Sequence, residues 1–324
     1  MNGAESLIRS FTAAGVNVCF ANPGTSEMHL VQAVDAVPEM RAVLSLFEGV
    51  CTGAADGYGR MTGIPATTLL HLGPGLGNGI ANLHNARRAS TPVINLIGNH
   101  ALYHMDYDAP LTSDIGTLAK NVSSWVKGDS TASSLATDGM LALQFALTAK
   151  PGSAGQISTM IIPADACWNE EGAAASYINA PERRKVDDKV VSEVAHLLDN
   201  NSMILINSDG LSIEARIAAN RISEKTGCRV SMTPFPSRVD GGAGLPGCER
   251  LPYFPEQVMA ALNGVEKLIL AGADSPVSFF AYPNTPSVLV PENCAVVRLS
   301  ESEEDTTQAL ESLADFLGVS GGGY

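Results

Sequence analysis

Short apolar runs alternate with segments of helical spacing along the first half of the chain. Runs of strand length occupy residues 16–20, 42–46, 66–70, 93–97 and 157–162. Helical spacing lies between them, at residues 5–14, 28–34, 48–60 and 136–149, and in a stretch that follows a glycine turn and ends at residue 88. Strands and helices that alternate in this way are joined by right-handed crossovers, so this half predicts an open, mainly parallel sheet.

The alternation restarts in the second half of the chain. Strands are expected at 203–207, 229–232, 267–271 and 295–299, and helices at 187–198, 213–225, 255–262 and 306–317. The segment between the halves consists mainly of small and polar residues and is interrupted by Pro181. We therefore predict an α/β protein of two open, doubly wound, mainly parallel-sheet domains, at residues 1–170 and 187–319, with a linker at 171–186. The glycine-rich residues 320–324 are expected to be the start of a further linker or a truncated end.

Composition narrows the classes of protein. With 324 residues, 45% hydrophobic and 17% charged, the chain suits two well-packed domains. It shows no apolar run near the ~20 residues of a membrane helix and no apolar signal core at the N-terminus, so we expect a cytoplasmic protein without a membrane partner. The six scattered cysteines lack CxxC spacing, which indicates reduced thiols and argues against a zinc site. The net charge of −14 disfavours nucleic acid as a partner.

Three expected strand-to-helix turns of the first domain carry unusual polar residues. They are Asn22–Thr25, Leu46–Gly49 and His71–Asn78. In an open parallel sheet, ligands bind at the carboxyl ends of the strands. The three turns are therefore candidates for one common site.

Glu48 is the most informative residue of these turns. It closes an apolar strand between Leu46, Phe47 and Val50, so we expect its carboxyl group to be desolvated. The ordinary explanation is an acid at a helix start, where the helix dipole contributes about 0.3–1 kcal/mol. Burial favours the protonated form more strongly than the dipole opposes it. A buried carboxyl group of this kind could share a proton with a heterocyclic nitrogen.

The expected helix after Glu48 is rich in glycine, with Gly49, Gly53, Gly57 and Gly59. Each interior glycine costs roughly 0.5–1 kcal/mol relative to alanine, so something must approach this helix closely. Tight packing within the domain is one explanation. A subunit interface is the other, and it predicts a homo-oligomer, at least a two-fold dimer.

The glycines after His71 do not form a dinucleotide fingerprint. With Gly73 and Gly75 in the first two positions of G-x-G-x-x-G, the third falls on Asn78, and a start at Gly75 places it on Ile80. The spacing therefore disfavours a nucleotide-binding oxidoreductase.

Taken together, the three segments resemble the pyrimidine-binding domain of the thiamine-diphosphate-dependent 2-oxo acid decarboxylases and acetolactate synthases (acetohydroxyacid synthases). The matching stretches are ANPGTSE, LSLFEGVCTGAADGYGRMTGIPA and LLHLGPGLGNGIANLHNARRASTPVINLIGNH. The likeness runs through most of residues 1–170, and the second domain resembles the family's middle domain less specifically. It implies thiamine diphosphate as cofactor, a 2-oxo acid as substrate, and decarboxylation or carboligation as the reaction. It leaves open whether the middle domain holds FAD.

The resemblance also assigns roles to residues. Glu48 would bond the pyrimidine ring nitrogen, and the cofactor would be lined by Pro23, Gly24, Gly73, Pro74, Gly75 and Asn78. His71 stands where benzoylformate decarboxylases carry histidine and would transfer protons, unless it is a strand-end histidine satisfied by the backbone. Thr25 would contact the substrate, with an ordinary helix cap as the alternative. The acids Glu27 and Asp56 are expected to lie outside the chemistry.

The resemblance breaks at the diphosphate. Family members bind the diphosphate and Mg²⁺ with a third domain that opens on Gly-Asp-Gly, and the nearest imitation, Asn207–Gly210, lacks the first glycine. We therefore expect the magnesium ligands to lie outside this chain. The chain would then be a fragment of a longer protein or one subunit of a split enzyme. We expect it to assemble as a dimer or tetramer. A non-catalytic subunit is the other class, and the retention of Glu48 speaks against it.

Overall fold

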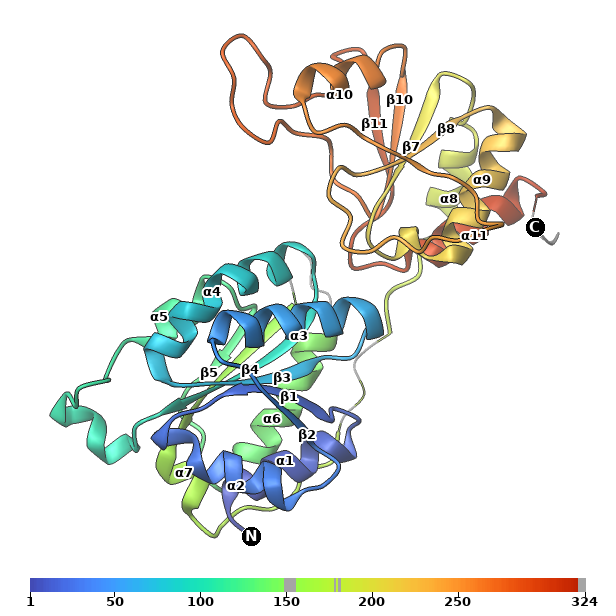
Figure 1. Cartoon of the computed structure of the whole chain (residues 1–324). Coiled ribbons are helices and arrows are strands. Elements are labelled where there is room, and N and C mark those ends of the chain that lie inside the picture. The colour runs from blue at the N-terminus through green and yellow to red at the C-terminus, as the bar shows by residue number, and fades with distance from the viewer. Residues whose placement is uncertain (149–155, 178, 180–181, 320–324) are drawn as a thin grey trace. The chain divides into compact units, whose positions relative to one another are not determined.

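The structure is a computed structural model that describes residues 1–148, 156–177, 179 and 182–319. The chain divides into two compact units, Met1–Pro181 and Glu182–Tyr324 (Figure 1). Both units are open parallel sheets covered by helices, which confirms the predicted fold class. No helix in the described ranges is long and apolar enough to cross a membrane.

Unit 1 contains a six-stranded sheet in the order β2-β1-β3-β4-β6-β5, with every neighbouring pair parallel. Its strands are β1 (Val18–Asn22), β2 (Arg41–Leu44), β3 (Ala66–Leu70), β4 (Pro92–Asn99), β5 (Trp125–Lys127) and β6 (Gln156–Pro163). One face carries the helices α1 (Gly3–Ala13), α2 (Met28–Ala36), α6 (Leu135–Leu147) and α7 (Ala164–Trp168). The other carries α3 (Glu48–Thr62), α4 (Leu72–Arg88) and α5 (Ile115–Lys120) (Figure 1).

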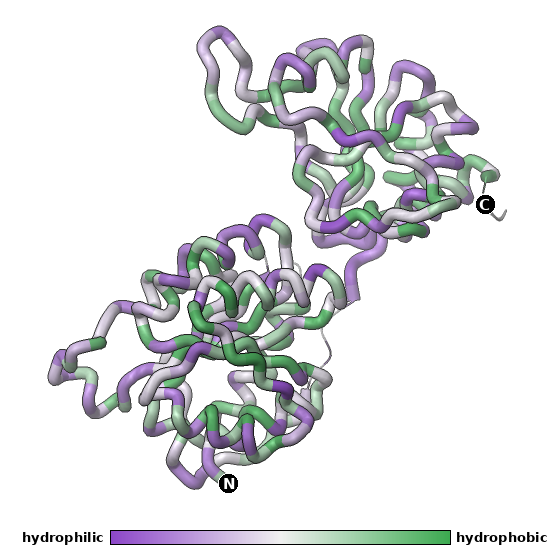
Figure 2. Tube along the Cα trace, in the orientation of Figure 1, coloured by the Kyte–Doolittle hydropathy of each residue, from purple (hydrophilic) through white to green (hydrophobic). Residues whose placement is uncertain are grey.

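The central strands of unit 1 are apolar on both sides because both faces of the sheet are covered. On β3, Leu69 joins the core under α1 and α6, while the next residue, Leu70, joins the core under α3 and α4. On β4, Leu96 and Ile97 divide in the same way. The hydrophobic stretches of both units run through the interior, as the green segments of Figure 2 show.

Unit 2 contains a five-stranded parallel sheet in the order β11-β10-β7-β8-β9. Its strands are β7 (Ser202–Ile206), β8 (Arg229–Met232), β9 (Glu249–Arg250), β10 (Lys267–Ala271) and β11 (Ala295–Ser300). The helices α8 (Asp188–Ala195), α9 (Ile213–Thr226) and α11 (Thr306–Phe316) pack together over one core. The helix α10 (Pro255–Ala261) packs in a second core.

The expected linker at 171–186 is partly structured at both ends. The amide nitrogen of Gly172 donates to Met1 O at 3.0 Å, and that of Ala175 donates to Ser10 Oγ at 2.9 Å, so this end packs on unit 1. At the other end Arg183 Nη1 donates to Asp209 Oδ1 at 2.9 Å within unit 2. Backbone and side-chain hydrogen bonds therefore make the connection shorter than the polar composition indicated.

Candidate active site

The three candidate turns of unit 1 follow adjacent strands. Gly24 follows β1, Glu48 follows β2 and His71 follows β3, and the order β2-β1-β3 places these strands side by side. Because the strands are parallel, the three turns lie at the same edge of the sheet. The contacts agree, since a Cβ atom added at Gly24 would overlap the ring of His71.

Glu48 begins α3 and is held against α4. Asn78 Nδ2 donates a hydrogen bond to Glu48 Oε2 at 3.0 Å. A Cβ atom added at Gly75 would lie 3.4 Å from Oε1, so the first turns of α4 come close to the carboxylate. No hydrogen bond to Oε1 is found among the described residues, which leaves this oxygen for a ligand.

The expectation that apolar neighbours bury the Glu48 carboxyl group is wrong within this chain. Glu48 is only partly buried, Leu46 is 94% exposed, and Phe47 and Val50 are also exposed. The physical reason is the position of β2 at the edge of the sheet, where the residues before α3 have no further strand beside them. An apolar surface therefore lies next to Glu48, where we had expected a closed pocket.

The segment after His71 is helical, which corrects the predicted glycine turn. His71 is the N-cap of α4, Leu72 has a φ of 54°, and the amide of Gly75 already donates to His71 O at 2.8 Å. Pro74 is exposed and fits the first helical turn, where a missing N–H is tolerated. A Cβ atom at Gly73 would overlap Ser113 Oγ, so this glycine permits close packing within the chain.

The glycines of α3 are mostly explained by contacts within unit 1. A Cβ atom at Gly53 would lie 3.0 Å from Asn82 Nδ2 on α4, and one at Gly59 would press on Thr91. At Gly49 it would meet the ring of Phe47. Tight packing of α3 therefore accounts for three of the four glycines, and Gly57 alone has no described atom within 4 Å of that position.

His71 is paired with Glu27, an acid that the sequence interpretation placed outside the chemistry. Glu27 ends the 3-10 helix η1 (Thr25–Glu27) and is fully buried. Its Oε2 lies 2.8 Å from His71 Nδ1 and accepts a hydrogen bond from the amide of Gly24 at 2.7 Å. The signal was present in the sequence, because an acid three residues after Gly24 occupies the position from which a side chain reaches back to a helix start.

The remaining polar residues of these turns surround this pair. Ser26 Oγ lies 3.4 Å from His71 Nδ1, and Thr25 is the exposed first residue of η1. The ring of His100, which follows β4, lies 5.8 Å from that of His104. The structure thus gathers Thr25, Ser26 and His71 beside Glu27 at one edge of the sheet.

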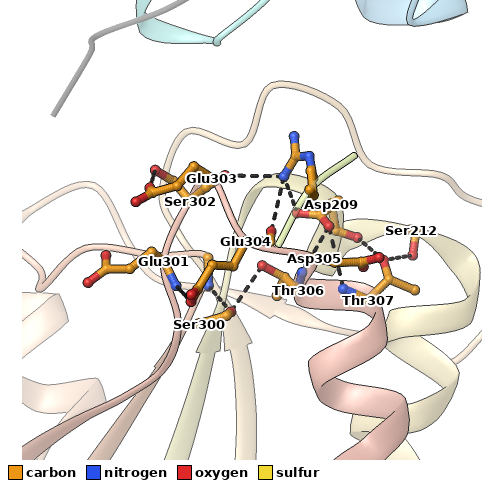
Figure 3. A network of polar contacts seen from close by, with 12 residues as sticks. Asp209, Ser212, Ser300, Glu301, Ser302, Glu303, Glu304, Asp305, Thr306 and Thr307 are labelled. Atoms are coloured by element: carbon orange, nitrogen blue, oxygen red, sulfur yellow. Dashed lines mark hydrogen bonds and ion pairs between the residues drawn. The ribbon is translucent and has the colours of Figure 1, made fainter. Parts of the chain in front are cut away.

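In unit 2 the turn after β7 binds the start of α11 (Figure 3). Asp209 Oδ2 accepts from the amides of Thr306 and Thr307 at 3.0 and 3.5 Å, and Oδ1 faces Arg183. Ser300 Oγ, at the end of β11, donates to Thr306 Oγ1 at 3.0 Å. The amides that begin α11 are thus occupied by a carboxylate of the chain itself.

Comparisons with known proteins match the first 120 residues, which lie in unit 1, to a family. Residues 1–120 match the family described as "Thiamine pyrophosphate enzyme, N-terminal TPP binding domain". These residues are a domain of the thiamine pyrophosphate enzyme family. The acetolactate synthase large subunit-like protein IlvX of Mycobacterium tuberculosis is 51% identical over 317 residues, which are 97% of this chain and 60% of that protein.

Two further relatives belong to the decarboxylase side of the family. Benzoylformate decarboxylase of Pseudomonas aeruginosa is 33% identical over 112 residues, covering 34% of this chain and 21% of that protein. The solved structure of Rhodococcus jostii thiamine diphosphate-dependent 4-hydroxybenzoylformate decarboxylase has the same fold, with a TM-score of 0.82 at 20% identity over 98% of this chain and 62% of the other. The chain thus spans about 60% of the length of IlvX and of this structure.

Proposed function

We propose that the chain is the pyrimidine-binding part of an enzyme that decarboxylates or ligates 2-oxo acids with thiamine diphosphate. The observation that carries the proposal is the carboxylate of Glu48, held by Asn78 beside the glycine-lined start of α4, in a domain of the thiamine pyrophosphate family. The names of the relatives, acetolactate synthase and benzoylformate decarboxylase, support the reaction class.

The residues at this edge fit the pyrimidine ring of the cofactor. Glu48 Oε1 would share a proton with a ring nitrogen, while the bond from Asn78 fixes the orientation of the carboxylate. The cofactor would be lined by the backbone of Gly24, Gly73 and Gly75 and by the rings of Pro23 and Pro74. When bound, thiamine diphosphate supplies the electron sink, and the protein supplies placement and electrostatics.

The substrate side of the site is formed by His71 and Thr25. His71 would move a proton to and from the substrate, because an imidazole can both accept and donate near neutral pH. The Thr25 hydroxyl is exposed beside it and would contact the carboxylate or carbonyl of a 2-oxo acid.

The diphosphate and Mg²⁺ would be held by another segment or another chain. No group of three or more histidine, cysteine or acidic residues suited to a metal is found in the described part of the chain. The alternative proposal is that this chain is a separate subunit, to which another chain supplies the diphosphate site, or a non-catalytic partner. The six cysteines are free, which supports a reducing, cytoplasmic location.

Thermal unfolding tests the cofactor assignment. Thiamine diphosphate with Mg²⁺ is expected to raise the Tm of the form that carries the diphosphate site, because a ligand at a hundred times its Kd stabilises the native state by about 2.7 kcal/mol. The 324-residue chain alone is expected to show almost no shift, and MgCl₂ alone serves as the control. Strong magnesium-dependent stabilisation of the short chain would contradict the placement of the diphosphate site.

We also propose that unit 2 holds no flavin dinucleotide with its phosphates at the start of α11. A phosphate there would need the amides that begin α11, and Asp209 already accepts from Thr306 and Thr307. Glu301, Glu303 and Glu304 lie at the same edge, where Arg298 pairs with the first and Arg184 with the other two (Figure 3). Purified protein is expected to lack flavin absorbance and to leave the fluorescence of added FAD unchanged, and saturable quenching of that fluorescence would contradict the proposal.

A further inference from the structure

Glu27 is completely buried, which is unusual for an acidic side chain. It is 0% exposed, and burying a carboxylate costs free energy unless the group is paired and hydrogen-bonded. Oε2 has two partners, the amide of Gly24 at 2.7 Å and His71 Nδ1 at 2.8 Å. Oε1 is buried and has no hydrogen-bond partner among the residues that the structure describes. The Gly24 amide and His71 Nδ1 are therefore the described partners that offset the burial of this group.

Two glycines leave the space that the pair occupies. A Cβ atom at Gly24 would overlap the ring of His71, and one at Gly98 would overlap Glu27 Oε1. The backbone of the turn after β1 and the backbone of β4 thus lie close to the pair. This close fit leaves Glu27 little freedom to move away from the ring.

The nearest thiol does not compete for the proton of this pair. Burial, and then the negative charge of Glu27, raise the pKa of the Cys167 thiol to about 12. The Cys167 thiol therefore stays protonated near neutral pH.

We propose that Glu27 is the positioning residue for His71: its carboxylate accepts the proton on Nδ1 and so keeps Nε2 as the bare, proton-accepting nitrogen of the neutral ring. His71 is 27% exposed and Glu27 is not exposed at all, so the ring offers its other nitrogen for a reaction at the edge of the sheet. The inference deepens the proposed function, because it defines how His71 would act there.

The proton balance is simple. When the lone pair of His71 Nε2 takes a proton from an O–H donor at the edge of the sheet, the new N–H bond replaces the O–H bond, whose electron pair stays on the donor oxygen, and the Nδ1 proton stays on the ring. The resulting positive ring faces the negative carboxylate of Glu27 at 2.8 Å. A carboxylate that orients a histidine in this way stabilises the charged ring without taking its proton. The same proton returns from Nε2 in the reverse step.

The test is the tautomer of His71 in the 324-residue chain without cofactor. Long-range ¹H–¹⁵N correlation spectra of ¹⁵N-histidine-labelled protein, recorded at a pH where the ring is neutral, report which nitrogen carries the proton, and His71→Gln assigns the signal. We expect a protonated Nδ1 and a bare Nε2 in the wild type. Glu27→Gln should abolish or reverse this preference, because an amide can also donate, and Glu27→Asp should restore it in part. Glu39→Gln, which removes an exposed acid of unit 1, should change nothing.

The wild-type spectrum alone decides the case if Glu27→Gln does not fold. A proton on Nε2 in the wild type, or the same tautomer in wild type and a folded Glu27→Gln protein, would overturn the inference. Failure of cofactor binding would leave these spectra unchanged and would count against the proposed function alone. In the cofactor-loaded enzyme, Glu27→Gln should lower kcat by at least about 10–100-fold, the range for loss of the carboxylate behind a metal-bound histidine, with little change in KM.

Discussion

Glu27 and Glu48 show how two acids at one sheet edge come to have different surroundings. Glu27 is buried against Gly98 of β4, and one of its oxygens has no partner in the described part of the chain. Glu48 is partly exposed at the start of α3, with Asn78 on one oxygen. Local spacing indicated the importance of Glu48, but the pairing of Glu27 joins residues 44 positions apart and required the fold.

Substitution of Gly98 is expected to disturb the buried pair directly. The added methyl group of Gly98→Ala would overlap Glu27 Oε1, and the packed surroundings leave that side chain little room. Overpacking of this kind lowers the free energy of unfolding by about 1–3 kcal/mol. Urea unfolding measures the loss.

Gly57→Ala is the matched control for Gly98→Ala. The methyl group at position 57 meets no described atom within 4 Å, and alanine favours a helix interior. This variant is expected to gain roughly 0.5–1 kcal/mol. A Gly98→Ala protein as stable as the wild type would contradict the clamped geometry around Glu27.

Most elements of the fold were predictable from the alternation of apolar runs and helical segments. The expected strands at residues 66–70, 229–232 and 267–271 coincide with β3, β8 and β10. The missed elements include α5, α7, β5 and β9, which are short, and the three residues of β5 are all half-buried at the edge of the sheet. A strand of that length carries no alternation from which it could be recognised.

The first turns of α4 were not predictable for another reason. Glycine and proline in Gly73–Pro74–Gly75 have low helix propensity, which favoured a turn. Tertiary packing overrides that preference, because Ser113 and Leu70 require the absence of Cβ atoms there. The segment thus follows β3 as expected, but it forms the first turns of a helix where a turn was predicted.

The contact between Asp209 and α11 is expected to stabilise the start of this helix. Asp209→Ala removes the acceptor for the amides of Thr306 and Thr307 and the ion pair with Arg183. Loss of such a cap costs about 1–2 kcal/mol, so the unfolding transition of unit 2 should move to lower urea. Asp274→Ala, at a 96% exposed side chain, should have little effect, and equal effects of the two substitutions would contradict the capping role.

At the scale of the whole molecule, the apolar surface beside Glu48 supports a homo-oligomer. Leu44 and Leu46 are 72% and 94% exposed, and Phe47 and Val50 adjoin them. A contiguous apolar patch of this kind marks an interface in soluble proteins. Because three glycines of α3 are explained within the chain, this surface is now the stronger support for assembly.

Leu46→Glu is expected to weaken that assembly. A charge placed in the apolar interface would have to lose its hydration on association, so light scattering should show a shift from dimer or tetramer toward monomer at micromolar concentration. Val239→Glu, at an exposed apolar residue of unit 2, should leave the mass unchanged. A wild-type monomer at tens of micromolar, in this chain and in any longer form, would contradict the proposal.

The rate of deuterium exchange at the thiazolium carbon of bound thiamine diphosphate tests the central claim most directly. The measurement compares wild type, Glu48→Gln and the control Glu39→Gln in the form that carries the diphosphate site, by quenched-flow NMR. Glu48→Gln preserves shape but removes the proton that Glu48 shares with the pyrimidine, so exchange should slow by ~10²–10⁴-fold while cofactor affinity changes less. Exchange at the wild-type rate in Glu48→Gln would contradict the account and leave Glu48 as an acid at a helix start.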